Sequence, residues 1–152
     1  MARERLLESV QFVGRPLPEV FAFFSDAGNL ERITPAFLHF RILSPMPVEM
    51  RPGALIEYRI RLFGIPFRWE TLIEQWEAGV RFVDTQRRGP YALWHHTHEF
   101  RAVPGGTLVV DRVRYALPMG LLGEIGHALF VRRSLGRIFG HRRRVIGEIL
   151  GI

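Results

Sequence analysis

Hydrophobic and polar residues alternate along much of the chain, which is the pattern of strands with one buried and one exposed face. A first alternating run covers residues 5–13 and ends in a break at residues 14–18 that contains two prolines. Val20, Phe21 and Phe24 then follow at helical spacing. Asp26 or Asn29 would cap a second short helix, which we expect to end near residues 34–35, because proline disfavours helical backbone in the residue before it.

Six further strand-like runs lie between residues 37 and 117. The segments that separate them are short and rich in turn-forming residues, such as Pro52-Gly53 and Gly89-Pro90. Connections this short join antiparallel neighbours, because a parallel crossover needs about a dozen residues or more. We therefore predict strands at residues 37–43, 54–62, 67–77, 80–87, 92–103 and 107–117.

The pattern becomes helical after Pro118 and stays helical to the last residues. A helix of about thirty residues would be about 45 Å long and would cross a whole sheet. The order of elements predicts an α+β fold, in which a curved antiparallel sheet of about seven strands wraps around a long C-terminal helix and two short helices follow the first strand. We expect a single domain over residues 1–152. The apolar face of the long helix combines Leu121, Ile125, Ala128, Leu135, Ile138, Phe139, Val145, Ile146 and Ile149.

Composition narrows the class of protein. The 152 residues are 47% hydrophobic and 24% charged, which is typical of a folded domain. The chain has no cysteine, which excludes disulfides, thiolate metal sites and a cysteine nucleophile. The first eight residues carry charges where a signal peptide would be apolar, and no run of about 18 uncharged apolar residues occurs, so we expect a cytoplasmic protein.

The net charge of +6 comes from arginine, which is concentrated near the C-terminus. Arg132, Arg133, Arg137 and residues 142–144 form either a solvated helix face or a surface for transient contact with anionic membranes. No helix-turn-helix, zinc-finger or base-stacking signature accompanies these arginines, so we expect no nucleic-acid partner.

The segment from Trp94 to Phe100 carries the most distinctive chemistry. On a strand, Trp94, His96, His98 and Phe100 point to one side, and the aromatic ends indicate that this side faces the interior. Two histidines on one face suit a metal ion, and Asp84 or Asp111 could supply a third ligand, but nothing in the spacing enforces this, so we expect no metal.

Asp84 and Asp111 are the candidate partners of these histidines. A buried histidine held by either aspartate would form a structural or ligand-orienting polar network, because buried charged groups need partners. The alternative is acid–base catalysis with His96 or His98 as the base and an aspartate orienting it. Arg142 lies near the apolar face of the long helix, where it would pair with an interior aspartate or a ligand anion, or extend its head to solvent.

Several short motifs occur in a characteristic order. They are Asn29-Leu30 with Ile33-Thr34-Pro35, Phe82-x-Asp84-x-Gln86, Gly89-Pro90-Tyr91, Trp94-x-His96-x-His98-x-Phe100, and Asp111-x-Val113-x-Tyr115 with Pro118-x-Gly120. In this order the motifs resemble the helix-grip (SRPBCC) superfamily, a fold shared by StAR-related lipid-transfer domains, birch-pollen-allergen-like proteins and bacterial polyketide cyclase/dehydrase proteins. Within it they resemble a bacterial subgroup of small ligand-binding proteins, and the resemblance covers nearly the full length.

This resemblance implies a deep cavity between sheet and helix, in which relatives hold lipids, sterols, polyketides, hormones or quinones. A minority of relatives catalyse cyclisation or dehydration there. The loops at residues 62–66 and 118–122 would either gate the mouth of the cavity or pack as ordinary loops.

We therefore predict that the chain binds or transports a small hydrophobic ligand without a cofactor, as a monomer or a homodimer. The alternative is an enzyme resembling a polyketide cyclase or dehydratase, with His96, His98 and Asp111 as its acid–base groups. The predicted ligand-contacting residues are Tyr58, Trp69, Asp84, Trp94, His96, His98, Phe100, Asp111, Tyr115 and Arg142.

Overall fold

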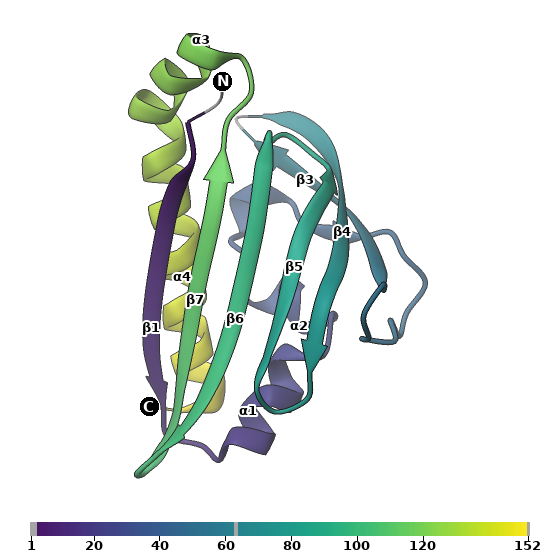
Figure 1. Cartoon of the computed structure of the whole chain (residues 1–152), viewed down its shortest axis with the longest axis vertical. Coiled ribbons are helices and arrows are strands. Elements are labelled where there is room, and N and C mark those ends of the chain that lie inside the picture. Colours follow the sequence, from purple (N-terminus) through teal and green to yellow (C-terminus); the bar gives the residue numbers. More distant parts are fainter. Residues whose placement is uncertain (1–2, 63, 152) are drawn as a thin grey trace.

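A strongly curved antiparallel sheet and one long C-terminal helix dominate the computed structural model (Figure 1). The structure describes residues 3–62 and 64–151, and within these residues seven strands pair in the order β1-β7-β6-β5-β4-β3-β2. The strands are β1 (Arg5–Val13), β2 (Arg41–Ile42), β3 (Leu55–Leu62), β4 (Ile65–Glu77), β5 (Arg81–Arg88), β6 (Leu93–Val103) and β7 (Gly106–Ala116).

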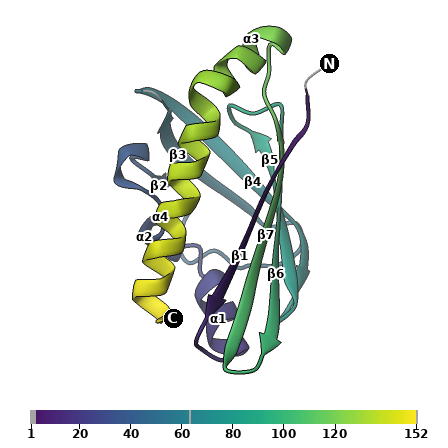
Figure 2. The same ribbon diagram turned by 90° about the vertical axis from the view of Figure 1, so that its left-hand side faces the viewer.

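The helices lie on one side of this sheet. Two short helices, α1 (Leu17–Phe24) and α2 (Asn29–Arg32), follow β1, and a 3-10 turn at Ala36–Leu38 precedes β2. The C-terminal helix consists of α3 (Gly120–Gly126), a π-helical turn (His127–Val131) and α4 (Arg132–Leu150). Figure 2 shows these three pieces as one continuous rod that crosses the sheet. The predicted fold is therefore confirmed.

The pairing of the strands, and an irregular register between two of them, explain the curvature of the sheet. Each strand from β2 to β6 pairs with the next strand along the chain, and β1 pairs with β7 at one edge of the sheet. The register between β4 and β5 shifts after Glu70 and again after Ile73. Such irregularities bend a strand and increase its twist. The bend turns β3 and β4 toward the long helix, and a hollow is left beneath the helix.

The main core closes one end of this hollow. Phe21 and Phe24 of α1 pack against Phe82 of β5 and Phe100 of β6, with the ring centroids of Phe21 and Phe100 5.1 Å apart. Ile146, near the end of α4, is buried in the same cluster. Because aromatic residues bury large apolar areas, this cluster attaches both α1 and the last turns of α4 to the sheet.

Two local predictions differ from the structure. The strand expected at residues 37–43 is reduced to the two residues of β2, because a 3-10 turn begins after Pro35 and His39 adopts a left-handed backbone with φ 48°. Neither Asp26 nor Asn29 caps α2, whose N-cap is Gly28. The Asp26 carboxylate accepts a hydrogen bond from the Gly28 N–H, and the Asn29 side chain donates to the Phe23 carbonyl.

The apolar face of the C-terminal helix is buried only in part. Leu135 and Ile146 are buried against the sheet, as the pattern predicts. Leu121, Ile125 and Ala128 are exposed instead, because the first turns of the helix extend past the end of the sheet (Figures 1 and 2). Within the described ranges, no helix is long and apolar enough to cross a membrane.

Candidate functional site

A cavity of about 170 Å³ lies between α4 and the concave face of strands β3 to β6. Strand alternation explains its lining, because every second residue of β3, β4 and β6 faces the helix. Leu135, Ile138 and Phe139 of α4 cover the cavity, and residues of α1 and α2 close one side. The strands contribute Ile56, Tyr58, Ile60, Trp69, Thr71, Ile73, Asp84, Trp94, His96 and His98 to the lining.

Ten residues were predicted to contact a ligand, and the structure divides them into two groups. Among the described residues, Tyr58, Trp69, Asp84, Trp94, His96, His98 and Arg142 line the cavity.

Phe100, Asp111 and Tyr115 lie outside this lining. Phe100 belongs to the aromatic core with Phe21 and Phe24. Asp111 lies behind the two histidines, and the Tyr115 hydroxyl bonds the Nε2 atom of His127 at 2.9 Å. Alternation along a strand thus predicts which face a residue occupies, but not whether cavity or packed core lies above that face.

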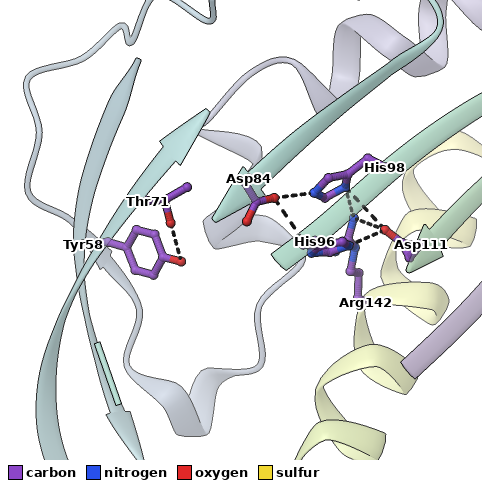
Figure 3. Close-up of polar contacts among 7 residues, drawn as sticks. All are labelled: Tyr58, Thr71, Asp84, His96, His98, Asp111 and Arg142. Atoms are coloured by element: carbon purple, nitrogen blue, oxygen red, sulfur yellow. Dashed lines mark hydrogen bonds and ion pairs between the residues drawn. The ribbon is translucent and has the colours of Figure 1, made fainter. Parts of the chain in front are cut away.

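The polar end of the cavity is a compact cluster from three adjacent strands and α4 (Figure 3). His98 Nε2 donates to the Asp84 carboxylate at 2.5 Å, and His96 Nε2 donates to the Asp111 carboxylate at 2.8 Å. His98 Nδ1 also lies 3.4 Å from the Asp111 carboxylate. Arg142 Nη2 lies 3.3 Å from the same Asp111 oxygen, so the arginine turns inward instead of reaching solvent.

Strand register brings these side chains together. Asp84 on β5 is paired with His96 on β6, and His98 on β6 is paired with Asp111 on β7. Phe82, which is paired with His98, stacks on that ring with centroids 4.1 Å apart. The two imidazole rings stack in turn, at 3.7 Å. The stack holds both rings in fixed orientations.

The two histidines differ in pKa although both are buried. Burial lowers the pKa of His98, but hydrogen bonds to Asp111 and Asp84 outweigh burial and raise it above its ordinary value. Burial and the charge of His98 lower the pKa of His96 to about 4. The first proton that the pair binds is therefore favoured on His98, and His96 is neutral at neutral pH.

Both aspartates are ionised. Burial alone would raise the pKa of Asp111, but Arg142 and the hydrogen bonds from His96 and His98 hold it well below its usual value. The pKa of Asp84 is also lowered, because the hydrogen bond from His98 and nearby positive charges outweigh burial. With His98 protonated, the two carboxylates face one imidazolium and one guanidinium, and the cluster is balanced in charge.

Neutral His96 keeps one free lone pair. Its Nε2 must carry the proton, because the Asp111 carboxylate can only accept a hydrogen bond. Its Nδ1 is therefore an acceptor, and it lies 3.9 Å from the Asp84 carboxylate, which is also an acceptor. A hydroxyl or amine of a ligand would satisfy this pair.

Hydrogen-bond donors occur on the other side of Asp84 (Figure 3). Thr71 Oγ1 donates to the Tyr58 hydroxyl at 3.3 Å, which leaves the Tyr58 proton free to donate. The indole Nε1 of Trp69 is buried and has no hydrogen-bond partner among the described residues. A buried donor without a partner is costly, so an acceptor on a ligand would stabilise this side.

The geometry of the cluster also permits a metal ion. Ligand atoms of Asp84, His96 and His98 lie within 4.8 Å of one another. A divalent ion would, however, have to displace the His98 proton and sit close to the Arg142 guanidinium. Electrostatics therefore favour the charge-balanced cluster.

Sequence reasoning did not select some lining residues. Tyr91 sits in the Gly89-Pro90-Tyr91 motif, and its backbone is held by the Gln86 side chain through two hydrogen bonds of 2.8 and 3.0 Å. Phe139 was placed on the apolar face of the helix but not at the site. Their signals in the sequence are those of ordinary packing residues.

The chain is similar to known proteins in sequence and in fold. Residues 13–135 match the model of the family described as polyketide cyclase/dehydrase and lipid transport. A protein of Thermus thermophilus is 16% identical with a TM-score of 0.75, covering 95% of each chain. The Zhui aromatase/cyclase of Streptomyces sp. R1128 is 13% identical with a TM-score of 0.69, covering 97% of this chain and 96% of that chain.

A larger protein contains a similar fold. A nucleoside-diphosphate sugar epimerase of Corynebacterium glutamicum is 21% identical with a TM-score of 0.67, and the match covers 93% of this chain but 28% of that chain. At these identities the structural matches show the fold alone. No curated protein sequence matches this chain.

Removing the Arg142 charge tests the charge balance. We expect Arg142→Met to lower the free energy of unfolding at pH 7 by about 3–5 kcal/mol, because Asp111 loses its guanidinium partner in a buried site. Arg144→Met, on the exposed side of the same helix, should change it by less than about 0.5 kcal/mol. Urea unfolding followed by circular dichroism measures both. Equal effects of the two substitutions would contradict the inward ion pair.

The dependence of stability on pH tests whether the His96 ring is neutral in the folded protein. The pKa of His96 is about 4 in the folded protein and 6.5 in the unfolded chain. The neutral ring therefore contributes its full stability above pH 6.5, and this contribution is lost as the pH falls from 6.5 to about 4. Over this window the wild type should lose roughly 3 kcal/mol more than His96→Gln. His98, whose pKa is raised, contributes more stability as the pH falls, but it is present in both proteins. Urea unfolding at several pH values measures the difference, and parallel pH curves would show that His96 is not neutral.

Proposed function

Because the chain belongs to the polyketide cyclase/dehydrase and lipid transport family, we propose that it binds a small, neutral hydrophobic ligand in the cavity beneath α4. Membership of this family implies either hydrophobic ligand binding or cyclase activity, and it confirms the resemblance seen in the sequence motifs. The observation that carries the proposal is an apolar cavity with neutral hydrogen-bonding groups on two sides of its lining.

The size of the cavity limits the ligand. An apolar protein cavity of about 150 Å³ holds benzene, whereas sites for drug-sized ligands span about 300–1,000 Å³. At about 170 Å³, the cavity suits one or two rings without rearrangement. The aromatic walls of Tyr58, Trp69 and Trp94 favour a planar ligand, because offset and edge-to-face ring contacts are attractive.

The polar atoms orient this ligand. Trp69 Nε1 and the Tyr58 hydroxyl would donate to a carbonyl or ether oxygen, while His96 Nδ1 and Asp84 would accept from a hydroxyl. The ligand is neutral, because an added charge would meet a cluster that is already balanced. An aromatic molecule with a carbonyl at one end and a hydroxyl at the other satisfies all these groups.

The protonation states favour binding over acid–base catalysis. A general base is most effective when its pKa lies near the working pH, and the pKa of His96 is about 4. His98 carries a proton, but Asp84 holds the Nε2–H at 2.5 Å. The cluster therefore supports a role in ligand orientation better than a role in cyclisation or dehydration.

Calorimetric titration with two bicyclic probes tests this proposal. We expect naphthalene and 1-tetralone each to bind one site per chain, with tetralone tighter because its carbonyl accepts from Trp69. Trp69→Phe should weaken tetralone binding about threefold to tenfold more than it weakens naphthalene binding, since one hydrogen bond is worth about 1 kcal/mol and both probes lose the same ring contact.

Trp76→Phe is the matched control, because Trp76 packs against Phe21 and Phe82 in the core and not in the cavity lining. This variant should bind both probes like the wild type. Failure of naphthalene to bind at all would overturn the cavity as a ligand site. Equal loss of both probes in Trp69→Phe would overturn the proposed orientation.

A further inference from the structure

The end of the molecule that carries α3 exposes a concentration of large apolar side chains. Leu121, Leu122 and Leu129, together with Met119, are between 61% and 77% exposed, and Ile125 is 47% exposed. At helical spacing, residues 121, 122, 125 and 129 lie on one stripe of the helix. Monomeric soluble proteins rarely leave large contiguous apolar patches uncovered, so this apolar tip is a candidate contact surface.

The tip is not stabilised as a helix by its own sequence. Gly120, Gly123 and Gly126 are each less favourable than alanine inside a helix. The N-cap residue Met119 has a left-handed backbone, with φ 71°, and makes no side-chain capping bond within the described chain. A segment of this kind gains from burial of its apolar stripe against another phase or molecule.

The charges around the tip are positive. Arg132 and Arg133 directly follow the apolar stripe, and both are exposed. Glu124 is the one acidic residue between residues 117 and 133, and it is paired with Arg5. Anionic lipid headgroups complement this rim, because the negative surface potential of such a membrane attracts arginines that lie near it.

The same charges disfavour a second copy of the chain as the occupant. In a two-fold contact the same surface meets itself, so Arg132 and Arg133 of one copy would approach those of the other. With Glu124 already paired, no free carboxylate of the tip would compensate this repulsion. An anionic membrane therefore fits the tip better than self-association does.

An apolar groove adjoins the cavity at the end of the molecule that carries the tip. It lies between the β3–β4 hairpin and the start of the long helix, and Ile65, Leu117 and Val131 line it. Leu62 and Tyr91 line both this groove and the cavity. Figure 1 shows the β3–β4 hairpin and α3 at the same end of the molecule. In the loop predicted to gate the cavity, Phe63 lies outside the described residues.

The arginine run at residues 142–144 does not lie beside the tip, unlike Arg132 and Arg133. Arg142 is inside the charged cluster, and Arg143 Nη1 donates to the Val10 carbonyl at 2.7 Å. These two side chains are engaged with the protein, and they lie several turns along the helix from the tip. Arg144 is exposed but lies equally far from the tip, so Arg132 and Arg133 are the arginines of the long helix placed next to the apolar stripe.

We propose that the chain docks on anionic membranes through the apolar tip, with Met119, Leu121, Leu122, Ile125 and Leu129 inserted and Arg132 and Arg133 at the headgroups. The groove between Ile65 and Val131 then opens toward the lipid phase and gives an apolar ligand a path to the cavity. This path rests on the proposed ligand-binding function, whereas the docking itself does not.

Co-sedimentation with vesicles tests the docking. The full chain should sediment with vesicles of phosphatidylcholine containing one quarter phosphatidylglycerol, and several-fold less with phosphatidylcholine alone. The Leu121→Gln/Leu122→Gln variant should lose binding about tenfold or more, because a buried leucine contributes about 1.5–3 kcal/mol. Arg132→Gln/Arg133→Gln should bind both kinds of vesicle equally weakly.

Leu43→Gln/Val80→Gln is the matched control, because it removes two exposed apolar side chains outside the tip. It should sediment like the wild type. Circular dichroism and naphthalene titration without vesicles check that every variant is folded and has a working cavity, so a failed cavity and a failed docking surface are told apart.

Three results would overturn the docking. The first is wild-type protein that stays in solution with both vesicles, and the second is a leucine variant that sediments like the wild type. The third comes from sedimentation velocity: a wild-type dimer that the leucine variant converts to a monomer would show that the tip is an interface between copies of the chain.

Discussion

Two carboxylates buried beneath a helix have to be neutralised, and this requirement couples α4 to the centre of the sheet. Asp84 and Asp111 flank β6, and their counter-charges come from His98 on β6 and Arg142 on α4. Burying an ion costs several kcal/mol, so the cluster is favourable only when all four groups are in place. The register of three strands and the rotation of α4 about its axis are therefore set together.

The same balance determines what the cavity can recognise. Since the charges compensate one another, the groups left for a ligand are neutral: the Trp69 indole, the Tyr58 hydroxyl and the Nδ1 atom of His96. Selectivity then depends on the spacing of donors and acceptors along an aromatic slot. A ligand lacking either group would leave a buried polar atom unsatisfied, which costs about 1–3 kcal/mol.

Sequence patterns predicted most of the strands and the long helix from local periodicity, whereas the side chains that reach the cavity depend on packing between distant elements. The bounds of β1 were predicted without error, because alternation is a local property. The direction of Arg142 was left open, since only the position of Asp111 across the interior resolves it. Phe100 was predicted at the cavity, but α1 brings Phe21 and Phe24 against that part of β6. Periodicity also predicted the apolar stripe of the long helix, but it cannot show that the sheet does not extend as far as Leu121.

His96 and His98 show how geometry separates two residues that the sequence presents as equivalent. Both occupy the same face of one strand, and their rings stack at 3.7 Å. His98 reaches both aspartates, while His96 hydrogen-bonds only to Asp111, so the first proton is held by His98. The charge of this proton then opposes a second proton on His96, because two like charges so close together repel each other. A motif that suggests a pair of catalytic bases thus becomes one fixed cation and one neutral acceptor, and the neutral acceptor is what a hydroxyl-bearing ligand requires.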